Sequence, residues 1–204
     1  MQEKLDKNGL TEKEFLAQYD ASRFERPSVT VDIIIIKNGK VLLIRRGGHP
    51  SIGKLAFPGG FLEPDEDVYS AARRELFEET GLKATNLRQL RVASEPNRDP
   101  RTRIITVPFL ADTEGGDTAI ANDDAADAAW YKVSKTELET PKGTLIQIKL
   151  SNNGATETFK VLRSLDKSGF RADPIYTPVG ETALAGDHSV LLAMALDHLN
   201  WIFV

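Results

Sequence analysis

The sequence predicts a mixed α/β fold. Two stretches, 67–81 and 187–199, space their apolar residues as helices do, and each begins at an aspartate suited to cap a helix. Runs rich in β-branched residues, typical of strands, occur at 28–36, 41–45, 86–94, 103–111 and 126–133. A chain of 204 residues fits one α/β domain with additions and is long enough to bury a real core.

The N-terminal part predicts an arm and then a hairpin. Residues 11–19 favour a short helix, and Arg26-Pro27 ends an arm of residues 1–27, because the residue before a proline disfavours helix. Asn38-Gly39 lies between the first two strands and is a strong signal for a two-residue hairpin turn. We therefore expect the main domain to occupy residues 28–204.

The helix at 67–81 is preceded by the Gly59-Gly60 turn and ends where Gly81 can adopt a left-handed conformation. At about 100° per residue, Glu79 falls inside its apolar stripe, Glu75 lies at the edge, and Glu78 lies just beyond. Ionised carboxylates on a half-buried face are costly unless paired. Because Mg²⁺ binds through one or two carboxylates plus substrate phosphates, this spacing predicts a Mg²⁺ or Mn²⁺ site with a phosphorylated substrate.

The same stretch resembles the Nudix box, G-x5-E-x7-R-E-U-x-E-E-x-G-U. All specified positions match, namely Gly60, Glu66, Arg74, Glu75, Leu76, Glu78, Glu79, Gly81 and Leu82. The resemblance implies a Nudix-type α/β/α sandwich with a mixed sheet. It also implies a hydrolase that uses a divalent metal to attack a nucleoside diphosphate linked to another group, X.

The resemblance further implies roles for individual residues. Metal ligands are expected at Glu75, Glu79 and Glu78, together with the backbone carbonyl of Gly60 or its neighbour. We expect Glu78 and Glu79 to act in catalysis and Arg74 to orient Glu75 or Glu78. Two roles stand open for Glu66, orienting the junction of loop and helix or balancing the helix dipole. The general base is often a loop acid in this family, which makes Asp123 and Asp124 candidates beside Glu78.

A second motif concerns the substrate. Residues 98–101, Arg-Asp-Pro-Arg, resemble the R-D-P-R-G element of the ADP-ribose pyrophosphatase subgroup, with Thr102 in place of the glycine. Arginine is suited to forked recognition of phosphate oxygens, so Arg98, Arg101 and Arg103 are candidate substrate ligands. The phrase LAGDH at 184–188 resembles the start of that subgroup's last helix, with Gly186 replacing a phenylalanine. For the histidines of the last helix we expect packing or surface roles.

Residues 142–182 form an insertion before the last helix. Alternating apolar residues on either side of a Ser-Asn-Asn-Gly turn at 151–154 predict a β-hairpin. Three roles stay open for it, namely extension of the sheet, an interface in a homodimer, and a lid over the substrate. The interface is favoured because exposed edge strands need cover.

The composition argues against several kinds of site and binding partner. The chain has no cysteine, which excludes disulfides and thiolate metal sites, and its formal net charge of -4 argues against nucleic acid. The N-terminus lacks the apolar core of a signal peptide, and no apolar run approaches the length of a membrane span. We therefore expect a cytoplasmic protein that acts on a small nucleotide without a membrane or nucleic-acid partner.

The substrate that the two motifs favour is ADP-ribose, cleaved to AMP and ribose 5-phosphate. The main alternative is another nucleotide, such as a dinucleoside polyphosphate, a sugar nucleotide or a damaged nucleotide, because the fold does not define X. A second alternative is a transcription regulator that senses ADP-ribose. It is disfavoured because the box is complete and residues 141–204 show no helix-turn-helix pattern. An isoprenoid diphosphate isomerase would need the absent cysteine.

Overall fold

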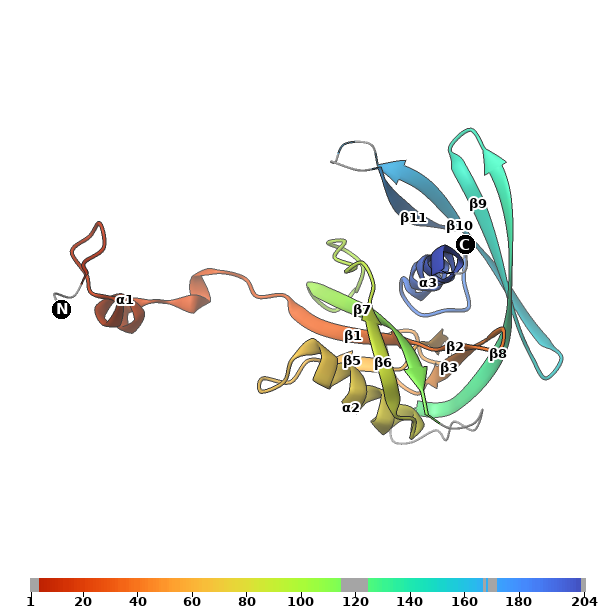
Figure 1. Ribbon diagram of the computed structural model, residues 1–204, viewed down its shortest axis with the longest axis horizontal. Coiled ribbons are helices and arrows are strands. Elements are labelled where there is room, and N and C mark those ends of the chain that lie inside the picture. The colour runs from red at the N-terminus through yellow and green to blue at the C-terminus, as the bar shows by residue number, and fades with distance from the viewer. Residues whose placement is uncertain (1–3, 115–124, 167, 169–171, 203–204) are drawn as a thin grey trace.

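The computed structural model describes residues 4–114, 125–166, 168 and 172–202. Figure 1 shows two helices, α2 and α3, on opposite sides of the central strands, with the N-terminal arm extending away from this body. Its elements are α1 (Glu12–Gln18), a 3-10 turn (Ala21–Arg23), β1 (Ser28–Ile34), β2 (Ile36–Lys37), β3 (Lys40–Arg46), β4 (Leu55–Ala56), β5 (Gly59–Phe61), α2 (Val68–Thr80), β6 (Ala84–Gln89), β7 (Ile104–Thr113), β8 (Ala125–Thr140), β9 (Gly143–Asn152), β10 (Ala155–Asp166), β11 (Asp173–Val179) and α3 (His188–Ile202).

The strands form two sheets. The first has the order β5-β1-β7-β6 and is mixed, because β1 and β7 are parallel while the other pairs are antiparallel. The second has the order β11-β10-β9-β8-β3-β2, and β4 pairs with β3. Strand β1 is buried on both faces. Val31 and Ile33 pack with α2 in one core cluster, whereas Ile34 belongs to the cluster around α3. This is the mixed α/β sandwich that the sequence predicts.

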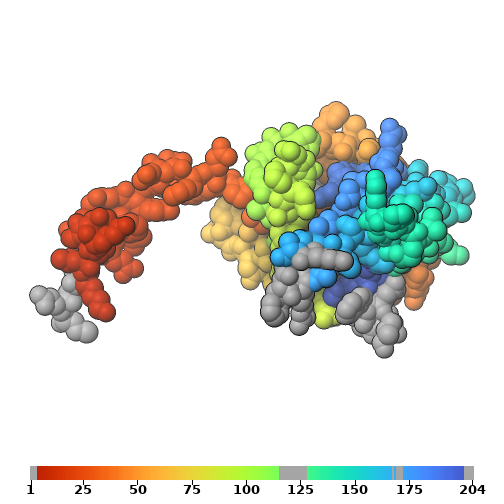
Figure 2. Space-filling view, turned by 90° about the horizontal axis from the view of Figure 1, so that it is seen from above, coloured from red at the N-terminus to blue at the C-terminus, as the bar shows by residue number. Residues whose placement is uncertain are grey.

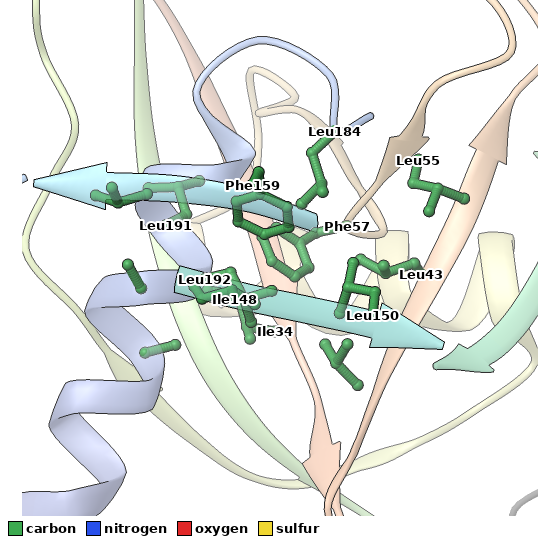
Figure 3. Close-up of a cluster of buried hydrophobic side chains, with 14 of the residues drawn as sticks. Ile34, Leu43, Leu55, Phe57, Ile148, Leu150, Phe159, Leu184, Leu191 and Leu192 are labelled. Atoms are coloured by element: carbon green, nitrogen blue, oxygen red, sulfur yellow. The ribbon is translucent and has the colours of Figure 1, made fainter. Parts of the chain in front are cut away.

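The insertion extends the second sheet. Strands β9 and β10 pair from the Asn153-Gly154 turn outward, which confirms the hairpin, and β11 adds a further antiparallel strand. Inward-facing side chains of this extension pack with α3 and with Phe57 in one core cluster, as Figure 3 shows. Sheet extension is therefore observed. The homodimer interface stays a prediction.

Several sequence-based boundaries shift. Strand β8 continues to Thr140 instead of ending at 133, because residues 132–140 pair with β9. Strand β6 ends at Gln89, and Ala93 beyond it makes an isolated bridge to Thr106. Helix α1 begins and ends within one residue of the predicted range, and a capping box between Thr11 and Glu14 closes its first turn.

The arm has little contact with the body. Helix α1 contains no buried residue, and Figure 2 shows the arm projecting from the rest of the molecule. Within the described part of the chain, no helix combines the length and hydropathy needed to cross a bilayer.

Candidate active site

A cleft of about 1040 Å³ lies between the β5–α2 junction, the 98–101 loop and the start of α3. Its walls carry acids, arginines, a histidine and backbone glycines. The sequence-predicted residues that line it are Gly60, Arg74, Glu75, Glu79, Arg98 and Arg101. The structure thus brings together two motifs that are separate in sequence, the acidic helix and the Arg-Asp-Pro-Arg segment.

Helix α2 is positioned by caps at both ends. The Asp67 carboxylate accepts hydrogen bonds from the N–H groups of Tyr69 and Ser70, and Gly81 ends the helix with φ of 70°. Its apolar face, which includes Ala72 and Leu76, is buried against β1 and β7. Because this face anchors the helix on the sheet, the acids beside it are directed along the sheet surface toward β5.

Two of these acids, Glu75 and Glu79, lie against the glycines of strand β5. The N–H of Gly59 donates to Oε2 of Glu79 over 2.8 Å. A Cβ atom on Gly60 would collide with the Glu75 carboxylate, so that carboxylate occupies the space a side chain would fill. Both glycines pair with β1, which fixes their position. The Gly59-Gly60 pair is therefore a close backbone approach to the acids as well as a turn.

Arg74 links the acids to the loop before the helix. Its Nη1 donates to Oε1 of Glu75 over 2.8 Å and to Oε2 of Glu78 over 3.0 Å. Its Nε and Nη2 bind the two oxygens of Glu66, and Nη2 also donates to the carbonyl of Phe61. Arg74 is thus placed to orient Glu75, and Glu66 is placed to orient Arg74.

Burial makes the acid pair electrostatically unfavourable when both members are ionised. Burial raises the pKa of Glu79 to about 7, against the favourable hydrogen bond from Gly59, and the charges of Glu75 and Asp32 raise it further. Burial also raises the pKa of Glu75, although Arg74 opposes this effect. A cation between Glu75 and Glu79 would relieve this cost.

The residues present fit a hard divalent cation. Among the described residues, no three His, Cys, Asp or Glu side chains converge as a ready metal cage. Mg²⁺ needs no such cage, because it binds through one or two carboxylates and completes its shell with water and phosphate oxygens. Glu75 and Glu79 are the acids of the α2 face that line the cleft. They are the residues we expect to hold the cation.

Other sequence-predicted residues lie elsewhere. The Glu78 side chain is 49% exposed, pairs with Arg74 and is outside the cleft lining. Arg103 also lies outside the lining, and its Nη1 is buried with no hydrogen-bond partner among the described residues. Asp123 and Asp124 lie outside the described residues. The roles given to these residues stay predictions.

The Arg-Asp-Pro-Arg segment contributes two differently held guanidinium groups. Arg98 forms a two-pronged pair with Asp187, its Nε and Nη2 donating over 2.9 and 2.7 Å, and its side chain is 7% exposed. Arg101 pairs with Asp99 and lies over the Phe61 ring, with Cζ 5.4 Å from the ring centroid. Its side chain is 43% exposed, so Arg101 is the more accessible of the two to a ligand.

Asp32 and His188 are among the cleft residues that the sequence did not predict as part of the site. Asp32 on β1 is 8% exposed, and Nε2 of His188 lies 3.4 Å from its Oδ1. Asp32 is hidden within an apolar run, where a lone aspartate carries no signal of function. His188 follows Asp187 in the LAGDH phrase, and that phrase was the one signal that pointed to it. Our expectation of a packing or surface role for His188 is incomplete, because its ring also lines the cleft.

Gly60→Ala tests the close approach. The added methyl group meets the Glu75 carboxylate, so we expect Mg²⁺ to bind at least about 10-fold more weakly, the equivalent of about 1.4 kcal/mol. Mg²⁺ affinity measured by calorimetry checks this. Gly48→Ala is the matched control, because its methyl enters open space. Equal affinities for the two variants would contradict the role given to Gly60.

Comparisons with known proteins agree with this geometry. The NUDIX domain family matches residues 26–150. An ADP-ribose pyrophosphatase of Methanocaldococcus jannaschii is 40% identical over 125 residues, which cover 60% of this chain and 73% of that protein. An ADPR responsive transcriptional repressor, NtrR, of Acinetobacter baylyi is 38% identical over 110 residues, covering 51% of this chain and 44% of the repressor.

Other relatives differ in their named activity and in the share of the chain that aligns. An NAD-capped RNA hydrolase, NudC, of Mannheimia succiniciproducens is 35% identical over 119 residues, covering 55% of this chain and 43% of the enzyme. The chain thus spans less than half of the repressor and of this hydrolase. The crystal structure of a MutT/nudix family protein from Enterococcus faecalis superposes with a TM-score of 0.70 and 33% identity, covering 93% of this chain and 70% of that one. The chain belongs to the Nudix family and is a Nudix hydrolase.

Proposed function

We propose that this Nudix hydrolase cleaves ADP-ribose to AMP and ribose 5-phosphate with Mg²⁺ or Mn²⁺. The observation that carries the proposal is the meeting of the buried acids Glu75 and Glu79 with the Arg-Asp-Pro-Arg loop in one cleft. The pyrophosphatase relative supports the same substrate. An acid pair that needs a cation, beside an exposed guanidinium group, suits a diphosphate.

The residues of the cleft have different roles in the proposed reaction. Glu75 and Glu79 would hold the cation, while Arg74 orients Glu75 and the N–H of Gly59 orients Glu79. When bound, the cation acidifies water and neutralises charge on the diphosphate oxygens. One phosphate gains the oxygen of water and the other leaves with the bridging oxygen, so the products are two monophosphates. Arg101 binds a phosphate through Nη1, since its bonds to Asp99 use Nε and Nη2.

The general base is proposed among Glu78, Asp123 and Asp124. Each is a carboxylate able to take a proton from water. Single substitutions to the amide separate them, because loss of the base lowers kcat and removes the acidic limb of the pH–rate profile, whereas loss of a solvated acid changes neither.

A substrate screen tests the proposal. Wild-type protein is incubated with Mg²⁺ or Mn²⁺ and ADP-ribose, NAD, dinucleoside polyphosphates, sugar nucleotides and NAD-capped RNA, and the products are identified. We expect the highest kcat/KM for ADP-ribose, with AMP and ribose 5-phosphate released. A higher value for another compound would replace ADP-ribose as the substrate. Higher activity on NAD-capped RNA would favour the activity for which the NudC relative is named.

A sensing role is the second candidate, because one relative is named an ADPR responsive transcriptional repressor. It predicts ADP-ribose binding without turnover and a DNA mobility shift that responds to ADP-ribose. The complete set of box acids in and beside the cleft supports turnover instead.

Arg101→Ala tests the substrate contact. Removal of an exposed guanidinium group that binds phosphate should raise KM for ADP-ribose about 10-fold, in line with the 1.5–3 kcal/mol typical of charged hydrogen bonds after partial solvent screening. Steady-state kinetics measure this change. Arg73→Ala is the control, because Arg73 is exposed on α2 and its Nη1 binds the carbonyl of Tyr69. An unchanged KM for Arg101→Ala would remove Arg101 from the substrate site.

A further inference from the structure

Asp32 and His188 form a polar pair that the hydrolytic mechanism above does not use. Both line the cleft, yet they come from β1 and the first residue of α3, far apart in sequence. The hydroxyl of Thr106 donates to Oδ2 of Asp32 over 2.6 Å, which fixes the carboxylate. The opposite carboxylate oxygen, Oδ1, is the one that faces Nε2 of His188.

The tautomer of His188 follows from its second contact. The N–H of Phe57 donates to Nδ1 of His188 over 2.9 Å, and the two rings stack with centroids 5.2 Å apart. A nitrogen that accepts a hydrogen bond carries no proton, so the proton of the neutral ring lies on Nε2. His188 therefore presents an N–H donor at the cleft, and its ring orientation is fixed by Phe57.

Both groups keep capacity for a ligand. The Nε2–Oδ1 distance of 3.4 Å is longer than the 2.7–3.2 Å of a good N–H···O bond, so the Nε2 donor is only weakly engaged. A carboxylate offers about four acceptor positions, and the described partners of Asp32 leave some of these positions open. A donor beside an acceptor is the arrangement that binds a hydroxyl group, which both donates and accepts.

Different chemical groups lie in the cleft beside the two ends of strand β5. Its residues run from Gly59, paired with Asp32, through Gly60 to Phe61, paired with Thr30. Glu79 binds at Gly59 and Glu75 lies against Gly60, so the acids lie along the Gly59-Gly60 part of the strand and away from Phe61. The Phe61 end offers an aromatic ring, which suits a flat nucleobase. The Asp32 end offers hydrogen-bonding groups, which suit a sugar.

We infer that Asp32 and His188 bind hydroxyl groups of the sugar on the far side of the diphosphate, opposite the nucleobase. The inference rests on the proposed function, because it assigns a subsite to X in the same cleft. It makes His188 a specificity-determining residue that selects a hydroxyl-bearing sugar at X. For a substrate whose X lacks hydroxyl groups at this position, Asp32 and His188 add nothing to the binding affinity.

Binding measurements without turnover test the inference. ADP-ribose and ADP differ by the terminal ribose, so their affinities are compared by calorimetry in EDTA. We expect His188→Asn and Asp32→Asn each to weaken ADP-ribose binding about 10-fold and to leave ADP binding unchanged. Equal weakening of both ligands, or no weakening of either, would overturn the inference. Circular dichroism and the melting temperature establish that each variant is folded.

A pair of His188 variants separates the cleft contact from packing. Asparagine keeps an acceptor near the N–H of Phe57 but does not reach the cleft, whereas glutamine keeps an N–H near the position of Nε2. We expect His188→Gln to retain more of the preference for ADP-ribose over ADP than His188→Asn. The reverse order would show that the Phe57 contact matters and would overturn the sugar contact.

The hydrolytic function and the sugar contact are tested by different measurements, so one can fail without the other. If wild-type protein with Mg²⁺ releases no AMP from ADP-ribose, the hydrolytic proposal fails. The inference is still judged on whether the wild-type preference for ADP-ribose over ADP in EDTA depends on Asp32 and His188.

Discussion

Glu79→Gln is expected to remove catalysis and to stabilise the metal-free protein at the same time. The rate should fall at least about 100-fold, the size typical of losing one electrostatic stabiliser of the transition state. Burial raises the pKa of Glu79 from 4.5 to about 7. A carboxyl group with a raised folded-state pKa opposes folding as pH rises above the unfolded value, and the cost reaches its full size above pH 7.

The expected gain in the free energy of unfolding is roughly 1–3 kcal/mol at pH 8, because glutamine keeps the shape without the charge. Thermal melts in EDTA at pH 8 and at pH 4.5 measure it, and the gain should shrink at the lower pH. Added Mg²⁺ should raise the melting temperature of the wild type and not that of the variant. Similar Mg²⁺ effects on both proteins would remove Glu79 from the metal site.

Asp197→Ala is expected to cause the largest loss of stability. The Asp197 side chain is 9% exposed and accepts hydrogen bonds from Lys135, Arg163 and Tyr176 at 2.7 to 2.9 Å. Burial alone would raise the pKa of this carboxyl, but these bonds keep it below its usual 3.8. The stabilisation is therefore present above pH 3.8 and is lost as pH falls through the lower folded-state value.

Removing Asp197 leaves Lys135 and Arg163, two partly buried cations, with Glu137 as their remaining acidic partner. We expect a loss of about 3 kcal/mol, the size typical of breaking a buried ion pair, and a melting temperature lower by roughly 6–12 °C. Urea unfolding measures the loss. The control is Glu157→Gln, because Glu157 is an exposed residue near the start of β10, and this change should alter stability by less than about 0.5 kcal/mol. A similarly small change for Asp197→Ala would show that Glu137 and solvent replace the lost partner.

Local signals were sufficient for many elements of the fold. Asn38 and Gly39 both have positive φ, 52° and 69°, as the hairpin turn requires. Asp67 and Gly81 end α2 as the sequence indicates, and the burial that raises the pKa of Glu79 agrees with its position in the apolar stripe. These features depend on neighbours within one or two turns of the chain, so sequence spacing contains the information.

Non-local contacts account for what the sequence analysis did not find. The length of β8 depends on pairing with β9, and the pairing of Asp32 with His188 depends on the docking of α3 against β1. Likewise, the sequence presents Arg98 as a positive charge available to a ligand. In the fold, Arg98 forms an ion pair with Asp187, which neutralises most of that charge. Spacing along the chain cannot reveal a partner that tertiary packing brings from 89 residues away.

Helix α3 connects the cleft to the inserted strands. Its first turn places His188 at the cleft, and Asp197 further along it is held by Arg163 of β10 and Tyr176 of β11. Because the same helix contacts both regions, we expect them to unfold in one cooperative transition. A ligand that binds only the folded cleft then slows amide hydrogen exchange in β9 and β10, although it touches neither strand.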